Sequence, residues 1–153
     1  MKIRPKLTVK EILRGTSVSH TRTDISVRDV ETILDEPGIR GGTNMGLSPI
    51  EAMMAALVGC TNVTAHKVAK SIEVEIDAMT VGATLTIDRR GILLLEEVDV
   101  PFREVDLSID MTTSANADEI EKIKTDLRRF CPVAKMIRSA GTTINEVWNI
   151  TRP

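Results

Sequence analysis

Two cysteines, Cys60 and Cys131, are the residues of this sequence best suited to covalent chemistry. A thiol acts as a nucleophile only when it is ionised, and with an ordinary pKa of about 8.5 it is mostly protonated at neutral pH. Because the two cysteines are far apart in the chain, only the fold can bring them together. The alternative for both is packing, since free cysteine is among the most buried residue types.

Arg40 and Glu51 are the charged candidates for activating Cys60. Arg40 lies in the glycine-rich stretch 35–46, which predicts an irregular loop. Its guanidinium would stay charged when buried and could donate to a thiolate and to a peroxide oxygen. Glu51 could orient Arg40 through a charge-assisted pair. Both residues also have purely structural explanations, Arg40 as an ordinary loop arginine and Glu51 as part of a helix cap.

The stretch 47–71 predicts one long helix that carries Cys60. Ser48 can cap it, Pro49 suits the first helical position, and Glu51 follows the cap by three residues, which is a capping box. The next residues are apolar on every side, so we expect other elements to surround this part. The apolar run is too short to cross a membrane. Cys60 lies about three turns into the helix, beyond the reach of the helix dipole, so its activation would need an adjacent cation.

The remaining elements indicate an α+β protein with a single domain over residues 1–153. Residues 5–34 predict two or three antiparallel strands, with turns at Gly15 and near residues 23–24. A helix is expected to begin after Asn116, with one apolar face that includes Phe130. Further strands are predicted over 73–87, 105–111 and 142–150, the first of them with a bulge at Gly82. A short helix is predicted over 133–139. Residues 92–100 could form a strand, a short helix or a partner contact.

Composition excludes several classes of function. The formal net charge of −2 argues against nucleic acid as a partner, and two Phe, one Trp and no Tyr provide no stacking platform for bases. Two Cys and two His without short ligand spacing argue against a zinc site. The sequence contains no phosphate loop or dinucleotide fingerprint, so no cofactor is expected. Without an apolar run of signal-peptide length, the protein is expected in the cytoplasm, with reduced thiols and no membrane partner.

Two stretches of the sequence resemble the OsmC/Ohr family of peroxide-reducing thiol proteins. They are GGTNMGLSPIEAMMAALVGCT, which is followed by an alternating strand and Asp88-Arg89-Arg90-Gly91, and the later FCPVAKMI; the similarity extends from about residue 16 to residue 150. The resemblance implies an intertwined homodimer in which two long buried helices are wrapped by antiparallel sheets. It also implies that Cys60 attacks an organic hydroperoxide and forms a sulfenic acid. Cys131 would then condense with it to a disulfide, which a dithiol donor of lipoyl type or a small thiol reduces.

The sequence departs from the family pattern beside Pro49. Arg40 stands near the place where the OsmC branch carries its activating arginine. In the characterised branches a glutamate directly follows the proline, whereas here Ile50 takes that position and Glu51 comes one residue later. On a helix this is a rotation of about 100°, so Glu51 need not face Cys60. The pattern is similar to a less characterised OsmC-like branch.

Three functional hypotheses follow. The first is a thiol-dependent peroxidase that reduces organic hydroperoxides in oxidative stress defence. The second is a protein of the same fold that binds a small apolar ligand without efficient peroxidase activity. The third is a disulfide reductant or redox sensor. The ligand-binding hypothesis is based on apolar side chains expected around Cys60, which are Met45, Met53, Met54, Leu57 and Met136.

Overall fold

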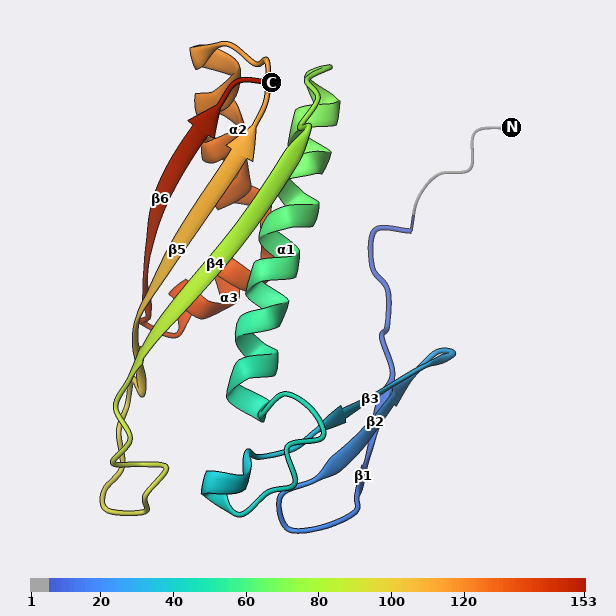
Figure 1. Ribbon diagram of the computed structural model, residues 1–153, viewed down its shortest axis with the longest axis vertical. Helices are drawn as coiled ribbons and strands as arrows, with labels where there is room; N and C mark the ends of the chain where they lie inside the picture. Colours follow the sequence, from blue (N-terminus) through green and yellow to red (C-terminus); the bar gives the residue numbers. More distant parts are fainter. Residues whose placement is uncertain (1–5) are drawn as a thin grey trace. The chain divides into compact units, whose positions relative to one another are not determined.

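The computed structural model describes residues 6–153, in two compact units whose boundary falls within the longest helix, after Met53 (Figure 1). Within residues 6–153, three α-helices and two sheets confirm the predicted α+β class. The expectation of one domain stays a prediction. In chain order the elements are β1 (Leu13–Ser17), β2 (Thr23–Val27), β3 (Val30–Leu34), the 3-10 helix η1 (Gly38–Arg40), α1 (Pro49–Ser71), β4 (Ala78–Ile87), β5 (Phe102–Thr112), α2 (Ala117–Phe130), α3 (Pro132–Ser139) and β6 (Thr143–Thr151).

The first unit contains an antiparallel sheet with the order β1-β2-β3. The predicted turn sites are wrong: Gly15 lies inside β1 opposite Ile25, and residues 23–24 lie inside β2. A Cβ at Gly15 would be only 3.1 Å from the Thr23 side chain, so this glycine makes room for the neighbouring strand. The turns lie instead at residues 18–22 and 28–29. Arg28 adopts a left-handed φ of 55° in the second of them.

The second unit contains a sheet with the order β4-β5-β6. β4 is antiparallel to β5, but β6 is parallel to it, so the sheet is mixed and not antiparallel throughout as expected. The reason is the helical crossover, since α2 and α3 carry the chain from the end of β5 back to the start of β6. The bulge is also misplaced in the prediction. Gly82 pairs regularly with Ser108, and the irregularity lies between Thr86 and Ile87.

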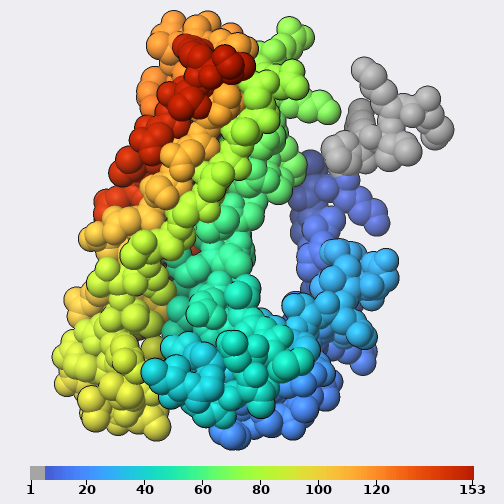
Figure 2. Space-filling model, viewed as in Figure 1, coloured from blue at the N-terminus to red at the C-terminus, as the bar shows by residue number. Residues whose placement is uncertain are grey.

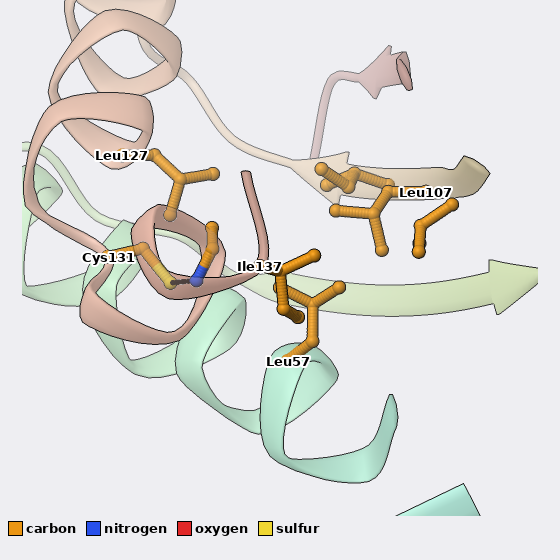
Figure 3. Packing of buried hydrophobic residues seen from close by; sticks show 8 residues of the cluster. Leu57, Leu107, Leu127, Cys131 and Ile137 are labelled. Atoms are coloured by element: carbon orange, nitrogen blue, oxygen red, sulfur yellow. Dashed lines mark hydrogen bonds between the residues drawn. The ribbon is translucent and has the colours of Figure 1, made fainter. Parts of the chain in front are cut away.

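The core of the second unit lies between one face of this sheet and its helices (Figure 1). Every second residue of β5 is buried from Val105 to Met111, as the alternating pattern predicted. Leu57 of α1 and Leu127 of α2 pack against this face, and α3 contributes Ile137 (Figure 3). The buried members of the cluster are Leu57, Val105, Leu107, Ile109, Leu127, Cys131, Ala134 and Ile137.

Helix α1 buries a single stripe of side chains in this chain. Leu57, Thr61, Ala65 and Val68 are buried, whereas Val63 is half exposed. Other elements were predicted to surround the apolar part that follows the cap, residues 52–58. Ala55 and Ala56 are exposed there, so this prediction is wrong for one chain by itself. The buried Thr61 is accommodated because its hydroxyl donates to the Leu57 carbonyl at 2.8 Å. No helix within residues 6–153 has the length and apolarity that a membrane crossing requires.

Helix α2 begins and packs largely as predicted. Asn116 caps it, and Glu119 completes a capping box. Ile120, Ile123 and Leu127 form its buried face. Phe130 does not join them: it is 58% exposed, because it occupies the last position of the helix and its ring contacts the Arg129 guanidinium. 

The connection from β4 to β5, residues 88–101, is an irregular loop that projects beyond the ends of both strands (Figure 1). In the space-filling view it is the yellow-green group of atoms at the lower end (Figure 2). The Asp88 carboxylate anchors its base by accepting from Arg90 and Arg103. The Arg90 guanidinium, followed by that of Arg103, holds the pKa of Asp88 well below its ordinary value. The outer part of the loop is apolar yet exposed, and comprises Ile92, Leu93, Leu94 and Leu95.

Candidate functional site

The two cysteines lie side by side in the second unit. Their Sγ atoms are 3.1 Å apart, and the Cys131 S–H donates to the Cys60 sulfur. Both are free thiols. The fold thus joins the two chemically distinctive residues that the sequence placed far apart. Formation of a disulfide between them would require only a small further approach of the sulfurs.

Cys60 is the more accessible of the two thiols. It lies about three turns into α1 and is half-buried, whereas Cys131 is buried. The Thr64 hydroxyl, one turn later, lies 3.9 Å from this sulfur. Of the methionines expected around Cys60, Met54 packs partly buried against the core cluster, whereas Met136 is largely exposed.

Cys131 forms the corner between α2 and α3. Its backbone N–H donates to the Leu127 carbonyl and ends α2, while Pro132 begins α3 as predicted. The extended backbone of Cys131 (φ −68°, ψ 108°) turns the chain between the helices. Its sulfur accepts from the backbone N–H of Ala134 at 3.4 Å, so the thiol caps α3 (Figure 3). The residue is completely buried.

Burial raises the pKa of the Cys131 thiol above its ordinary value, and the adjacent Cys60 raises it further. The N–H groups of Ala134 and Val133 act in the opposite direction, because they point at the sulfur from the start of α3. The net result is a thiol that stays protonated at neutral pH. Cys131 is therefore a hydrogen-bond donor to Cys60 in the reduced protein.

Glu51, in the first unit, forms the predicted helix cap. Its carboxylate accepts from the Ser48 N–H at 2.8 Å, and its own N–H donates to the Ser48 hydroxyl at 3.4 Å. The Ser48 backbone N–H is the main reason that the pKa of Glu51 is lowered, and the charge of Arg40 contributes to a smaller extent. The capping explanation for Glu51 therefore holds.

Arg40, also in the first unit, forms its ion pair with Glu36 and not with Glu51. Its Nε is 2.6 Å from the Glu36 carboxylate. Glu36 was absent from the residues that the sequence indicated. The signal that could have identified Glu36 is its spacing of four residues from Arg40, because side chains at i and i+4 can meet within a helical turn. Pro37 and Gly38 obscure that signal, since they read as a loop.

Asp35 is a second residue that sequence reasoning missed. It is completely buried, and its carboxylate accepts from the hydroxyl and N–H of Thr43 and from the N–H of Met45. These hydrogen bonds lower the pKa of Asp35 to about 2, and the bond from the Thr43 hydroxyl has the largest effect. Asp35 thereby closes the glycine-rich loop that carries Arg40. The glycines fit this closure, because a Cβ at Gly42 would collide with the Glu36 carbonyl.

The fold and the site together define a class: an α+β protein with a paired dithiol beneath a three-stranded sheet. Within residues 6–153, no group of three or more His, Cys, Asp and Glu side chains is arranged to hold a metal ion. The family model described as OsmC-like protein matches residues 42–147, more than half of the chain. The chain therefore belongs to the OsmC-like protein family, which confirms the family indicated by the sequence. A sequence search of curated proteins found no match.

Solved structures show the same fold at low sequence identity. An OsmC-like protein from Mycoplasma pneumoniae is 17% identical, with a TM-score of 0.79 over 95% of this chain and 99% of that chain. An organic hydroperoxide resistance protein OsmC from Legionella pneumophila is 16% identical, with a TM-score of 0.66 over 95% and 99%. The organic hydroperoxide resistance protein OhrB of Bacillus subtilis is 17% identical, with a TM-score of 0.59 over 94% and 98%.

Proposed function

We propose that this protein is a thiol-dependent peroxidase that reduces organic hydroperoxides. The observation that carries the proposal is the 3.1 Å separation of the Cys60 and Cys131 sulfurs. Their unequal burial supports unequal roles: the half-buried Cys60 meets the hydroperoxide, and the completely buried Cys131 meets only Cys60. The names of the Legionella and Bacillus proteins, which share the fold, agree with this substrate class.

The reaction has three steps. The Cys60 thiolate attacks the terminal peroxide oxygen and the O–O bond breaks, which makes a sulfenic acid at Cys60. The departing alkoxide takes a proton from solvent and leaves as the alcohol. The Cys131 sulfur then displaces the hydroxyl group from that sulfenic acid, and water leaves as the disulfide forms. Two thiols of an external reductant, which we propose is a lipoyl-type dithiol or a small thiol, take up the oxidation and restore both cysteines.

The protonation state of Cys131 suits this order of events. Its raised pKa keeps it as a thiol while Cys60 waits for peroxide. When the Cys131 sulfur attacks the sulfenic acid, its proton goes to the departing hydroxyl. The N–H of Ala134 already points at this sulfur and would stabilise the negative charge that develops there.

We further propose that Arg40 supplies the cation that favours the Cys60 thiolate, and that Glu36 holds Arg40. In the family pattern, the glutamate that follows the proline orients the arginine. The ion pair between Arg40 and Glu36, at 2.6 Å, supports the proposal that Glu36 has this role here. Glu51 then acts as the helix cap, as its bonds to Ser48 indicate.

Matched charge-removing variants separate the two glutamates. We expect Glu36→Gln to lower the rate of sulfenic acid formation at pH 7 by about tenfold, since a misplaced activating group can cost that much. Glu51→Gln keeps an oxygen that can accept from Ser48, so its rate is expected to match that of the wild type. Stopped-flow measurement of Cys60 oxidation gives both rates. If Glu51→Gln lowered the rate of Cys60 oxidation as much as Glu36→Gln, an orienting role would be assigned to Glu51 after all.

We also propose a cytoplasmic homodimer. The four consecutive exposed apolar residues 92–95 of the 88–101 loop support a partner chain, because a cluster of exposed apolar side chains often marks a contact. The half-exposed Val63 on α1 is a further apolar side chain that a partner could cover. A cytoplasmic location would keep the thiols reduced. Light scattering on purified protein tests the dimer, and the mass of a single chain would rule it out.

Intact mass and free-thiol count test the peroxidase directly. After one equivalent of cumene hydroperoxide, we expect the reduced protein to lose both thiols and about 2 Da, the mass of two hydrogen atoms. A small disulfide serves as the comparison substrate. A general disulfide reductant would react with it as fast as with the peroxide. Retention of both thiols over many minutes would overturn the proposal and favour the ligand-binding hypothesis.

A further inference from the structure

Glu146 places a carboxylate on the inner face of the sheet in the second unit. Along β6 the half-buried positions alternate with exposed ones, and Glu146 shares the inner face with Ile144, Trp148 and Ile150. Its side chain is only 4% exposed. A charged group at such a position is costly unless it is paired and hydrogen-bonded. The hydrogen-bond partners of the Glu146 carboxylate therefore indicate its role.

Three donors from three elements satisfy this carboxylate. Arg128 of α2 donates through Nε to Oε2 at 3.0 Å, and Arg138 of α3 donates through Nη2 to Oε1 at 2.9 Å. The Trp148 indole N–H of β6 donates to Oε2 at 3.1 Å. Each oxygen thus serves a different helix. One side chain of the sheet ties the end of α2 and the end of α3 together.

Cys131 occupies the corner that this arrangement spans. Arg128 precedes it on the last turn of α2, and Arg138 follows it on α3, so both arms of the corner are tied to the same carboxylate. Apolar packing of Leu127 and Ile137 holds the corner against the sheet but is not directional. Charge-assisted hydrogen bonds are directional, and they restrict how far the two helices can open.

We propose that Glu146 is a positioning residue that holds Cys131 at reacting distance from Cys60. The inference deepens the proposed function and rests on the Cys60–Cys131 pair. Without the carboxylate, α2 and α3 can swing apart at their junction, and the 3.1 Å contact between the sulfurs loosens. The step affected is the condensation of Cys131 with the Cys60 sulfenic acid. The preceding attack on peroxide changes much less, since α1 positions Cys60 and only the Cys131 S–H donor moves away from its sulfur.

Glu146→Gln removes the charge and keeps the side-chain volume. Its amide NH2 cannot accept a hydrogen bond, so one of the two arginines loses its partner. The matched control is Asp126→Asn. The Asp126 side chain is 12% exposed and pairs with Lys122 and Arg129, but both partners lie on α2 itself, so this variant loses a similar pair of contacts without affecting the corner.

The first measurement follows both thiols after one equivalent of cumene hydroperoxide, with dimedone present to trap sulfenic acid. We expect Glu146→Gln to form the sulfenic acid at close to the wild-type rate but to condense at least about tenfold more slowly, since small misplacements of reacting groups have effects of this size. The dimedone adduct should increase accordingly. In Asp126→Asn, Cys131 should condense with the sulfenic acid at the wild-type rate, even if the thermal midpoint of this variant falls as much as that of Glu146→Gln.

The second measurement does not depend on peroxide. Each protein is equilibrated with oxidised and reduced glutathione, where two protein thiols and one glutathione disulfide exchange for one protein disulfide and two glutathione thiols. We expect Glu146→Gln to weaken the protein disulfide by about tenfold, which is about 30 mV for this two-electron couple. Asp126→Asn should leave this equilibrium unchanged.

The outcomes distinguish this inference from the proposed function. If hydroperoxide leaves the wild-type thiols intact but the glutathione equilibrium shifts in Glu146→Gln alone, the peroxidase proposal fails and the positioning role stands. Equal condensation and equal disulfide stability in Glu146→Gln and the wild type would overturn the positioning role. An equal loss in Asp126→Asn would also overturn it, because general destabilisation would then explain the effect.

Discussion

Replacement of Cys60 by serine is expected to reduce hydroperoxide consumption to the rate of buffer, a fall of at least about a thousandfold, as is usual when a nucleophile is removed. A serine hydroxyl is almost entirely protonated at neutral pH. Within residues 6–153, the hydrogen-bond partners of the Cys60 sulfur are the Thr64 hydroxyl and the Cys131 thiol, and neither is a base that could activate a serine. The fold should survive, because oxygen can accept the Cys131 S–H in place of sulfur. A peroxide assay with cumene hydroperoxide and a dithiol reductant gives the rate.

Two controls make the Cys60→Ser result interpretable. Circular dichroism should show unchanged secondary structure, so that loss of activity reflects chemistry and not unfolding. Cys131 should remain a free thiol after peroxide treatment, because its complete burial leaves it without access to substrate. Substantial turnover by the variant would refute Cys60 as the peroxidatic residue. In that case the other thiol, or a group outside this pair, would have to perform the reaction.

Replacement of Cys131 by serine has the second-largest expected effect, and it should change the products more than the first rate. Cys60 can still attack hydroperoxide, but its sulfenic acid has no thiol beside it to condense with. We therefore expect dimedone to label nearly all of the protein after one equivalent of peroxide. With excess peroxide, mass spectrometry should show additions of about 16 Da per oxygen, as sulfinic and sulfonic acids form.

The wild type provides the comparison for Cys131→Ser. Its disulfide should protect Cys60, so that excess peroxide produces the mass of the disulfide and little overoxidation. Multiple turnover by the variant should be slow with a dithiol reductant, since the external thiol must reach the half-buried sulfenic acid directly. Protection of Cys60 in the variant to the wild-type extent would show that Cys131 has no resolving role.

The sequence by itself determined the features that depend on neighbouring residues. Ser48, Pro49 and Glu51 marked the start of α1, and Asn116 with Glu119 marked the start of α2, because a cap is made within one helical turn. Pro132 placed Cys131 between two helices for the same local reason. The motifs around the two cysteines also indicated the family, which the comparison over residues 42–147 confirmed.

The sequence misplaced features that depend on which segments become neighbours. Gly15 read as a turn, yet it makes room for the side chains of the adjacent strand. Phe130 continued an apolar helical face, yet α2 ends there and leaves the ring exposed. The parallel pairing of β6 followed from the helical crossover and was absent from the expected antiparallel sheets. For Gly15 and β6, the pairing of strands overrode a local pattern, whereas Phe130 is exposed because the helix ends at that residue.

Only the tertiary structure decided how the candidate residues are arranged. The 3.1 Å contact between the two sulfurs, the burial of Cys131 and the choice of Glu36 as the partner of Arg40 are all matters of position in space. The sequence supplied the reactive groups, since a thiol is recognisable by its type alone. Distance, burial and pairing arise when the chain packs, because they depend on contacts between segments that no spacing along the sequence encodes.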